Sequence, residues 1–184
     1  MYGMVNQFVI TTIINSFGEQ KVAEIEELLD FDINNYLTAK TYPDEQIYQI
    51  IAAAVKVLKI EQDELLEFAG KEWVKLVGNG PYKLMLDPES FDLFGFLSNL
   101  NSMHASIASQ LPELKPPSFI SLQKAPFLIE VQYFSNRPGL TYFVLGLLKG
   151  LCSHFNVEAD VAIGAMKKDS NTDHDKFLIS MKDN

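Results

Sequence analysis

The spacing of apolar residues changes at the proline pair Pro116–Pro117. Before this pair, apolar residues recur every three or four positions, which is the period of amphipathic helices. After it, the odd positions from Phe127 onward are largely apolar and the even positions include Glu130 and Gln132, which is the two-residue period of a half-buried strand. A helical first part, followed by strands with one further helix, predicts an α+β fold with an antiparallel sheet.

The same spacing places the individual elements. Asp87 followed by Pro88 has the composition of a helix start, because aspartate caps helices and proline favours the first helical position. A length of 184 residues suits one domain, which we divide into a helical part, 1–60, and a mixed part, 61–184. The expected helices cover residues 5–17, 21–29, 47–58, 61–77, 87–111 and 139–155, and the expected strands cover 127–137, 158–163 and 176–181.

Composition and charge exclude several classes of function. A net charge of -9 argues against nucleic-acid binding and against docking on anionic lipid, because both need clustered Lys and Arg. The longest strongly apolar stretch, 142–148, is far too short to cross a membrane, and no basic residue precedes Lys21 as a signal peptide requires. A single cysteine, Cys152, builds neither an internal disulfide nor a Cys-rich zinc site. We therefore expect a cytoplasmic protein.

One histidine lies within an apolar helical stripe. The stripe consists of Leu93, Leu97, Leu100, His104, Ile107 and Leu111. His104 is therefore either a metal ligand in a dry cavity or a core side chain that hydrogen-bonds a neighbour. The other histidines are weaker candidates, since His154 lies near a helix end and His174 lies in a polar loop where we expect it to be solvated. No histidine has partners at zinc spacing, so a lone histidine ligand implies a metal held mainly by a cofactor, as in haem.

The predicted strand ends in three polar residues, Tyr133, Ser135 and Arg137, which project from one side at two-residue spacing. A buried guanidinium needs an acidic partner, because desolvating an unpaired charge is costly. Two hydroxyls and a guanidinium make a suitable cradle for carboxylates such as the propionates of haem. The alternatives are that the strand end emerges into water, or that Arg137 pairs with a carboxylate of the protein.

The helix predicted over 139–155 carries Phe143, Gly146, Leu147 and Gly150 on one face. A glycine inside a helix costs about 1 kcal/mol relative to alanine, so two of them indicate a packing requirement. Close approach of this helix to a flat ligand or to the sheet would satisfy that requirement.

Together these features resemble the haem nitric oxide/oxygen binding family, usually called H-NOX. The segment from Tyr133 to Arg137 matches the Y-x-S-x-R motif of that family. The resemblance extends over essentially the whole chain, through residues 1–6, the His104 segment, the pair Pro116–Pro117 and the Gly146-Leu-Leu stretch. It implies the fold of that family enclosing haem b.

The resemblance assigns roles to individual residues. The family's haem-contacting positions correspond to His104 as the iron ligand, Tyr133, Ser135 and Arg137 at the propionates, Val5 and Pro117 against the porphyrin, and Phe143, Leu147 and Trp73 on the distal side. Core packing is the alternative role for Trp73, whose indole N–H would otherwise be a hydrogen-bond donor on the distal side.

Members that bind oxygen stably carry a distal tyrosine, and the corresponding position is Phe143, with Tyr142 adjacent. With phenylalanine there, bound oxygen receives no hydrogen bond from this position. Such a bond is worth roughly 1.5–3 kcal/mol, or about 10- to 100-fold in affinity. Nitric oxide binds ferrous iron strongly without that bond, so the resemblance predicts selectivity for nitric oxide.

The resemblance further implies a gas sensor with no catalysis of its own. Nitric oxide would weaken the bond between iron and His104, the helix would shift, and a separate protein would detect the change. By similarity to free-standing bacterial members, that effector is a histidine kinase or a cyclic-di-GMP enzyme, and carbon monoxide is a further ligand. The alternatives are an oxygen sensor of the same family and a haem-free scaffold. A haem enzyme is disfavoured because no acid–base pair is evident, and Cys152 alone excludes the cysteine zinc site of some members.

Overall fold

The computed structural model describes residues 1–80, 83–111 and 113–182, and the chain divides into two compact units, Met1–Leu65 and Leu66–Asn184. The boundary between the units lies between Leu65 and Leu66, inside the helix Gln62–Asn79. From the sequence we had divided the chain between residues 60 and 61. No helix of the described residues is long and apolar enough to span a membrane.

The first unit is helical. It contains α1 (Gly3–Phe17), α2 (Glu19–Glu26) and α3 (Asp44–Leu58), and α2 packs against both of the others. Gly18 separates α1 from α2 with a φ of 90°, a conformation that glycine adopts without strain. The core of the unit is formed by buried aliphatic and aromatic side chains, which include Phe8, Ile13, Val22, Ile25, Ile47 and Ile50.

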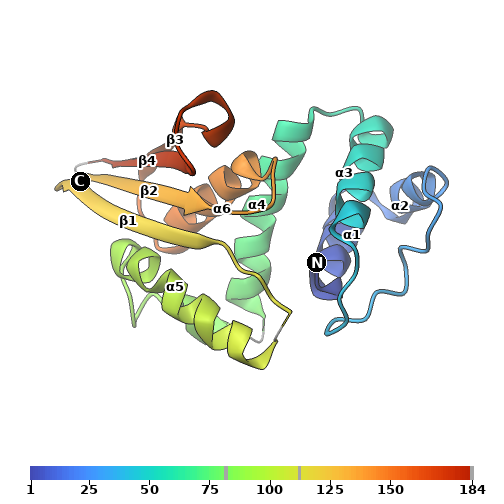
Figure 1. The fold of residues 1–184 in the computed structure, drawn as a ribbon, viewed down its shortest axis with the longest axis horizontal. Helices are drawn as coiled ribbons and strands as arrows, with labels where there is room; N and C mark the ends of the chain where they lie inside the picture. Colours follow the sequence, from blue (N-terminus) through green and yellow to red (C-terminus); the bar gives the residue numbers. More distant parts are fainter. Residues whose placement is uncertain (81–82, 112, 183–184) are drawn as a thin grey trace. The chain divides into compact units, whose positions relative to one another are not determined.

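The second unit combines a four-stranded sheet with helices. Its strands are β1 (Ser118–Ala125), β2 (Leu128–Phe134), β3 (Ala159–Ala165) and β4 (Asp175–Met181), in the order β1-β2-β4-β3 with every neighbouring pair antiparallel. Its helices are α4 (Gln62–Asn79), which starts before the unit boundary, α5 (Leu93–Gln110) and α6 (Thr141–His154), with short 3-10 turns η1 (Lys83–Leu86) and η2 (Lys167–Asp169). Figure 1 shows α5 running along β1. The expected α+β class is confirmed.

The core of the second unit forms where β2 and β4 pair. Ile129 and Val131 of β2 are fully buried and lie opposite Ile179 and Phe177 of β4. The two-residue period of the sequence therefore identified the inward face of β2 correctly. Glu130, on the other face, is also buried, with the ammonium groups of two lysines near its carboxylate.

The predicted start of α5 was wrong. Asp87 and Pro88 start a turn rather than a helix: the Asp87 carboxylate accepts hydrogen bonds from the Glu89 N–H at 3.1 Å and the Ser90 hydroxyl at 2.9 Å. The helix begins five residues later, where Asp92 is the N-cap and accepts a hydrogen bond from the Gly95 N–H at 2.6 Å. Both aspartates have capping chemistry, so the composition did not distinguish them.

Strand β1 was not predicted at all. It lies at the edge of the sheet, and Phe119 is its one buried residue, while Ile120 and Leu122 are exposed. A strand of this kind lacks the alternation of buried and exposed residues on which the prediction of β2 depended.

Candidate functional site

His104 lies in the second half of α5, one turn after the buried Leu100. Its ring is half-buried, and Nδ1 is 3.3 Å from the carbonyl oxygen of Pro117. Because a carbonyl only accepts hydrogen bonds, this contact places the ring proton on Nδ1 and the lone pair on Nε2. Burial lowers the pKa of His104, and the hydrogen bond to Pro117 opposes that shift only in part. The ring is therefore held in the neutral form that binds metals.

A second polar contact fixes α5 on β1 close to His104. Asn101 lies three residues before His104, and its side-chain amide forms two hydrogen bonds with the backbone of Phe119. The Nδ2 group donates to the Phe119 carbonyl at 2.7 Å, and Oδ1 accepts from the Phe119 N–H at 2.8 Å. The sequence prediction did not identify Asn101, because its partner is backbone and nothing in the sequence marks a backbone partner.

Phe119 also connects His104 with the polar motif. Its ring centroid is 6.0 Å from that of His104 and 5.3 Å from that of Tyr133. Tyr133 lies in β2 and is 5% exposed. The iron-ligand candidate and the first residue of the motif therefore both lie next to one buried aromatic ring.

Ser135 and Arg137 do not project from the strand as the sequence predicted, because β2 ends at Phe134. Both lie in the loop 135–140 and are half-buried. The backbone N–H of Arg137 donates to Ser135 Oγ at 3.0 Å, and the guanidinium donates to the carbonyl oxygen of Lys115 at 2.9 Å. Their positions are therefore set by the loop and by hydrogen bonds rather than by the alternation of a strand.

The residues expected on the distal side come from two helices of the second unit. Trp73 lies in α4, while Phe143 and Leu147 lie in α6. The rings of Trp73 and Phe143 meet edge to face, with centroids 6.3 Å apart and planes at 72°. Tyr142 is half-buried and packs against the core of the unit.

The glycines of α6 do have a packing role, but their partner is helix α4 rather than the flat ligand or the sheet that the sequence suggested. A Cβ atom on Gly146 would collide with the backbone carbonyl of Glu67, and one on Gly70 with the carbonyl of Phe143. A Cβ atom on Gly150 would lie 3.1 Å from the side chain of Val74. The two helices therefore approach backbone to backbone, which fixes the relative position of Trp73 and Phe143.

Val5 and Pro117 complete the set that the resemblance assigns. Val5 is half-buried in α1 of the first unit, and Pro117 is half-buried immediately before β1.

His174, which we expected to be solvated, is only 15% exposed, because its ring packs against Phe134 with centroids 4.8 Å apart. His154 binds the carbonyl oxygen of Leu86 through Nε2 at 2.6 Å.

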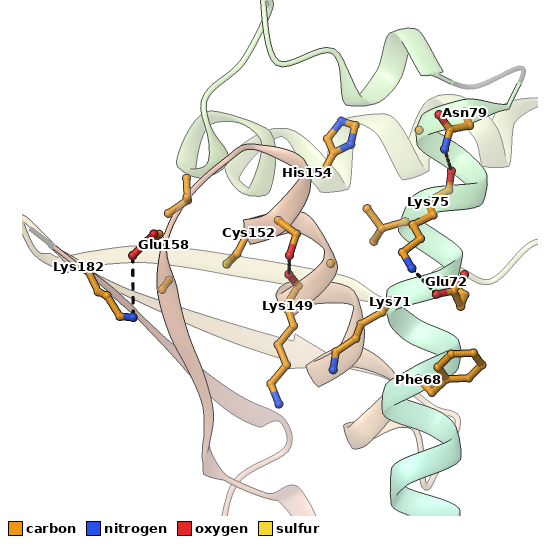
Figure 2. A pocket seen from close by; sticks show the side chains of 16 residues that line it. Phe68, Lys71, Glu72, Lys75, Asn79, Lys149, Cys152, His154, Glu158 and Lys182 are labelled. Carbon is orange, nitrogen blue, oxygen red and sulfur yellow. Dashed lines mark hydrogen bonds and ion pairs between the residues drawn. The ribbon is translucent and has the colours of Figure 1, made fainter. Parts of the chain in front are cut away.

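A groove of about 930 Å³ lies elsewhere on the second unit, between α4, α6 and the start of β3 (Figure 2). The ammonium groups along it have carboxylate partners: Lys71 and Lys149 both contact Glu67, Lys75 contacts Glu72, and Lys182 contacts Glu158. Burial raises the pKa of the Cys152 thiol in this groove to about 11, which leaves the sulfur protonated and unreactive. Among the described residues, the groove therefore offers neither unpaired cations nor a reactive thiol.

The donor set around His104 fits haem. No group of three His, Cys, Asp or Glu side chains gathers as a metal site in the described ranges. A neutral imidazole nitrogen, two hydroxyl groups and a guanidinium are the donors that a haem requires, because its macrocycle already coordinates the iron and carries carboxylates at its edge. Met103 and Ile107, which flank His104 on α5, are also half-buried and supply apolar surface.

Comparison with known proteins gives one family. The family described as Haem-NO-binding matches residues 2–163. Soluble guanylate cyclase gcy-31 of Caenorhabditis elegans is 23% identical over 175 residues, which are 95% of this chain and 25% of that protein. For gcy-37 of the same organism the identity is 31% over 160 residues, 81% of this chain and 22% of the relative. The chain thus spans about a quarter of the length of these relatives.

Solved structures show the same fold. The Fe(II) unliganded H-NOX protein from K. algicida is 21% identical with a TM-score of 0.85, and the match covers 100% of this chain and 98% of that one. A mutant of T. tengcongensis H-NOX is 20% identical with a TM-score of 0.88, and its match covers 100% of this chain and 98% of that one. An oxygen-binding H-NOX domain related to soluble guanylate cyclases, in its oxygen complex, is 20% identical, with a TM-score of 0.83 and coverage of 100% and 96%.

Proposed function

The chain belongs to the Haem-NO-binding (H-NOX) family, and from this premise we propose that it holds haem b through His104 and senses nitric oxide rather than oxygen. The observation that carries the proposal is the state of His104: a half-buried imidazole, neutral, with its proton on Nδ1 and its lone pair on Nε2. When bound, the haem supplies a ferrous iron to which a diatomic gas binds.

The other residues are proposed to contact different parts of the haem. Tyr133, Ser135 and Arg137 are proposed to bind the two propionates, since two hydroxyls and a guanidinium suit carboxylates. Val5 and Pro117 are proposed to contact the porphyrin. The hydrogen bond from His104 Nδ1 to Pro117 keeps the imidazole in one tautomer and one orientation.

Selectivity for nitric oxide is proposed to arise from the distal side. Phe143 has no polar atom, so it gives no hydrogen bond to bound oxygen, and Leu147 is equally apolar. The Trp73 ring lies edge to face against Phe143, and its indole N–H is the one polar group of these three side chains. Carbon monoxide, which needs no distal donor either, is expected to bind as well.

Signalling is proposed to run through α5. His104, Asn101 and the Pro117 carbonyl connect this helix to the start of β1, so a change in what His104 binds alters how α5 is held. The effector proposed to detect that change is a separate protein, a histidine kinase or a cyclic-di-GMP enzyme in the cytoplasm. We propose no catalytic reaction for the described residues.

The experiment is an absorption spectrum of the reduced protein, recorded in air and then with nitric oxide. We expect a haem spectrum that air does not convert to a stable oxygen complex and that nitric oxide shifts. A stable oxygen complex would support an oxygen sensor instead. Protein that stays colourless after expression with haem, and takes up none when haem is added, would support a haem-free scaffold.

A further inference from the structure

The loop that carries Ser135 and Arg137 begins and ends beside the same residue of β4. At its start, Tyr133 lies directly opposite Asp175 in the antiparallel pairing of β2 with β4. At its end, Thr141 is the first residue of α6, and its hydroxyl donates to Asp175 Oδ2 at 2.6 Å. Asp175 thus joins the two ends of the loop 135–140.

The carboxylate of Asp175 is suited to a structural role. The residue is 8% exposed, and its second oxygen, Oδ1, accepts a hydrogen bond from the Lys167 N–H at 2.7 Å. Both oxygens are therefore occupied by neutral donors, a hydroxyl and a backbone amide. Burying a carboxylate is costly unless hydrogen bonds replace those it made with water. The two hydrogen bonds of Asp175 meet this condition, which indicates that its carboxylate holds the surrounding backbone in place.

Inside the loop, two further features restrict the backbone. The Arg137 N–H is bonded to Ser135 Oγ, and Gly139 has a φ of 75°, which glycine adopts without strain. The loop is thus shaped by its own residues and closed at its base by Asp175. Arg137, near its middle, then reaches the Lys115 carbonyl at 2.9 Å.

We infer that Asp175 is a positioning residue: by holding Thr141, it keeps Ser135 and Arg137 in the arrangement that binds the haem carboxylates. This inference rests on the proposed function of those two residues. It predicts that loss of the contact between Thr141 and Asp175 loosens the loop while the pairing of β2 with β4 is retained. Haem is then released faster, although neither Thr141 nor Asp175 is among the residues proposed to contact it.

The test compares Thr141→Val, which removes the hydroxyl and keeps the shape, with Thr141→Ser, which keeps the hydroxyl. Haem loss is measured as transfer from the loaded protein to excess apomyoglobin. We expect loss to be faster by roughly tenfold in Thr141→Val, the scale of one hydrogen bond to a charged group, and unchanged in Thr141→Ser. Asp173→Asn is the matched control, since that neighbouring acid is 81% exposed and should leave the rate unchanged.

A second measurement does not depend on haem. Amide hydrogen exchange of the haem-free protein should become faster in residues 135–141 of Thr141→Val and stay unchanged in β2 and β4. Asp175→Ala combined with Thr141→Val should be no worse than Asp175→Ala alone, because the alanine already removes the acceptor of the Thr141 hydroxyl.

The outcomes separate this inference from the function on which it rests. If Thr141→Val keeps both its haem and its loop protection at the level of the unmodified protein, Asp175 does not position the loop. The same conclusion holds if Thr141→Ser is as impaired as Thr141→Val. If the unmodified protein binds no haem, the proposed function fails, and hydrogen exchange alone still decides whether Asp175 closes the loop.

Discussion

Helices α5 and α6 are attached to the second unit in opposite ways. Buried residues run along the whole of α6, from Val144 to Cys152, and Gly146 brings its backbone against that of α4. In α5 the buried residues end at Leu100, and the second half, which carries His104, is held by side-chain hydrogen bonds to residues at the start of β1.

The difference indicates which side of the proposed haem site is able to move. Where α6 crosses α4, backbone contacts backbone, so no side chain can change rotamer to accommodate a movement. Displacement of α6 would therefore disrupt the core. The hydrogen bonds that hold the end of α5 are each worth about 1 kcal/mol and break without opening the core. We therefore expect the distal side to be rigid and the proximal helix to respond to the gas.

The largest effect is expected from His104→Ala, which removes the proposed iron ligand from the weakly held helix. Haem affinity should fall by more than the roughly 10- to 100-fold that loss of an outer-shell partner costs a metal site, and added imidazole should restore the haem spectrum. The measurement is haem content after purification, with His174→Ala as the control that keeps haem. Retention of the original spectrum by His104→Ala would refute the assignment.

The rigidity of α6 is tested by Gly146→Ala. The added methyl group would meet the Glu67 carbonyl, so the helices must separate, and we expect a loss of about 3 kcal/mol in the free energy of unfolding. Chemical denaturation measures it. Gly164→Ala is the control, because a Cβ atom there lies at ordinary distances from Leu178 and Lys176. Equal stability of the two variants would show that the crossing tolerates separation.

Phe143→Tyr uses the same rigid helix to place a hydroxyl on the distal side. We expect oxygen affinity to rise by about 10- to 100-fold, since a donor to bound oxygen is worth roughly 1.5–3 kcal/mol. Oxygen titration of the ferrous protein measures this. Tyr142→Phe should have no effect, and the reverse pattern would assign the distal position to Tyr142.

The smallest effect is expected from Asn101→Leu, which removes both hydrogen bonds to Phe119. The free energy of unfolding should fall by about 1–2 kcal/mol. Amide exchange should become faster in the second half of α5 and not in α6. Asn99→Leu, at an exposed position of the same helix, is the control. Equal acceleration in α5 and α6 would remove the distinction between the two helices.

How much of this the sequence predicted depends on where each residue finds its partner. Ile129, Val131 and Tyr133 were predicted to face inward because burial on one face of a strand leaves a two-residue pattern. Residue types and spacing likewise singled out His104 and the Y-x-S-x-R motif. These patterns are local, so a sequence displays them directly.

The contacts that position those residues were not predictable. Asn101 binds the backbone of Phe119, and Asp175 binds the hydroxyl of Thr141 and the backbone of Lys167. Backbone groups are the same at every position, so no residue type marks such a partner. The prediction of where α5 starts failed for a related reason. Asp87 and Asp92 are equally good caps, and only the tertiary structure selects between them.

The buried sulfur of Cys152 has a consequence for a protein proposed to bind nitric oxide. Nitrosation and stepwise oxidation attack the anionic form of a sulfhydryl. With its pKa at about 11, only about one Cys152 in ten thousand carries that anion at neutral pH. Nitric oxide and the oxidants formed from it should therefore modify this buried sulfur much more slowly than an ordinary accessible thiol.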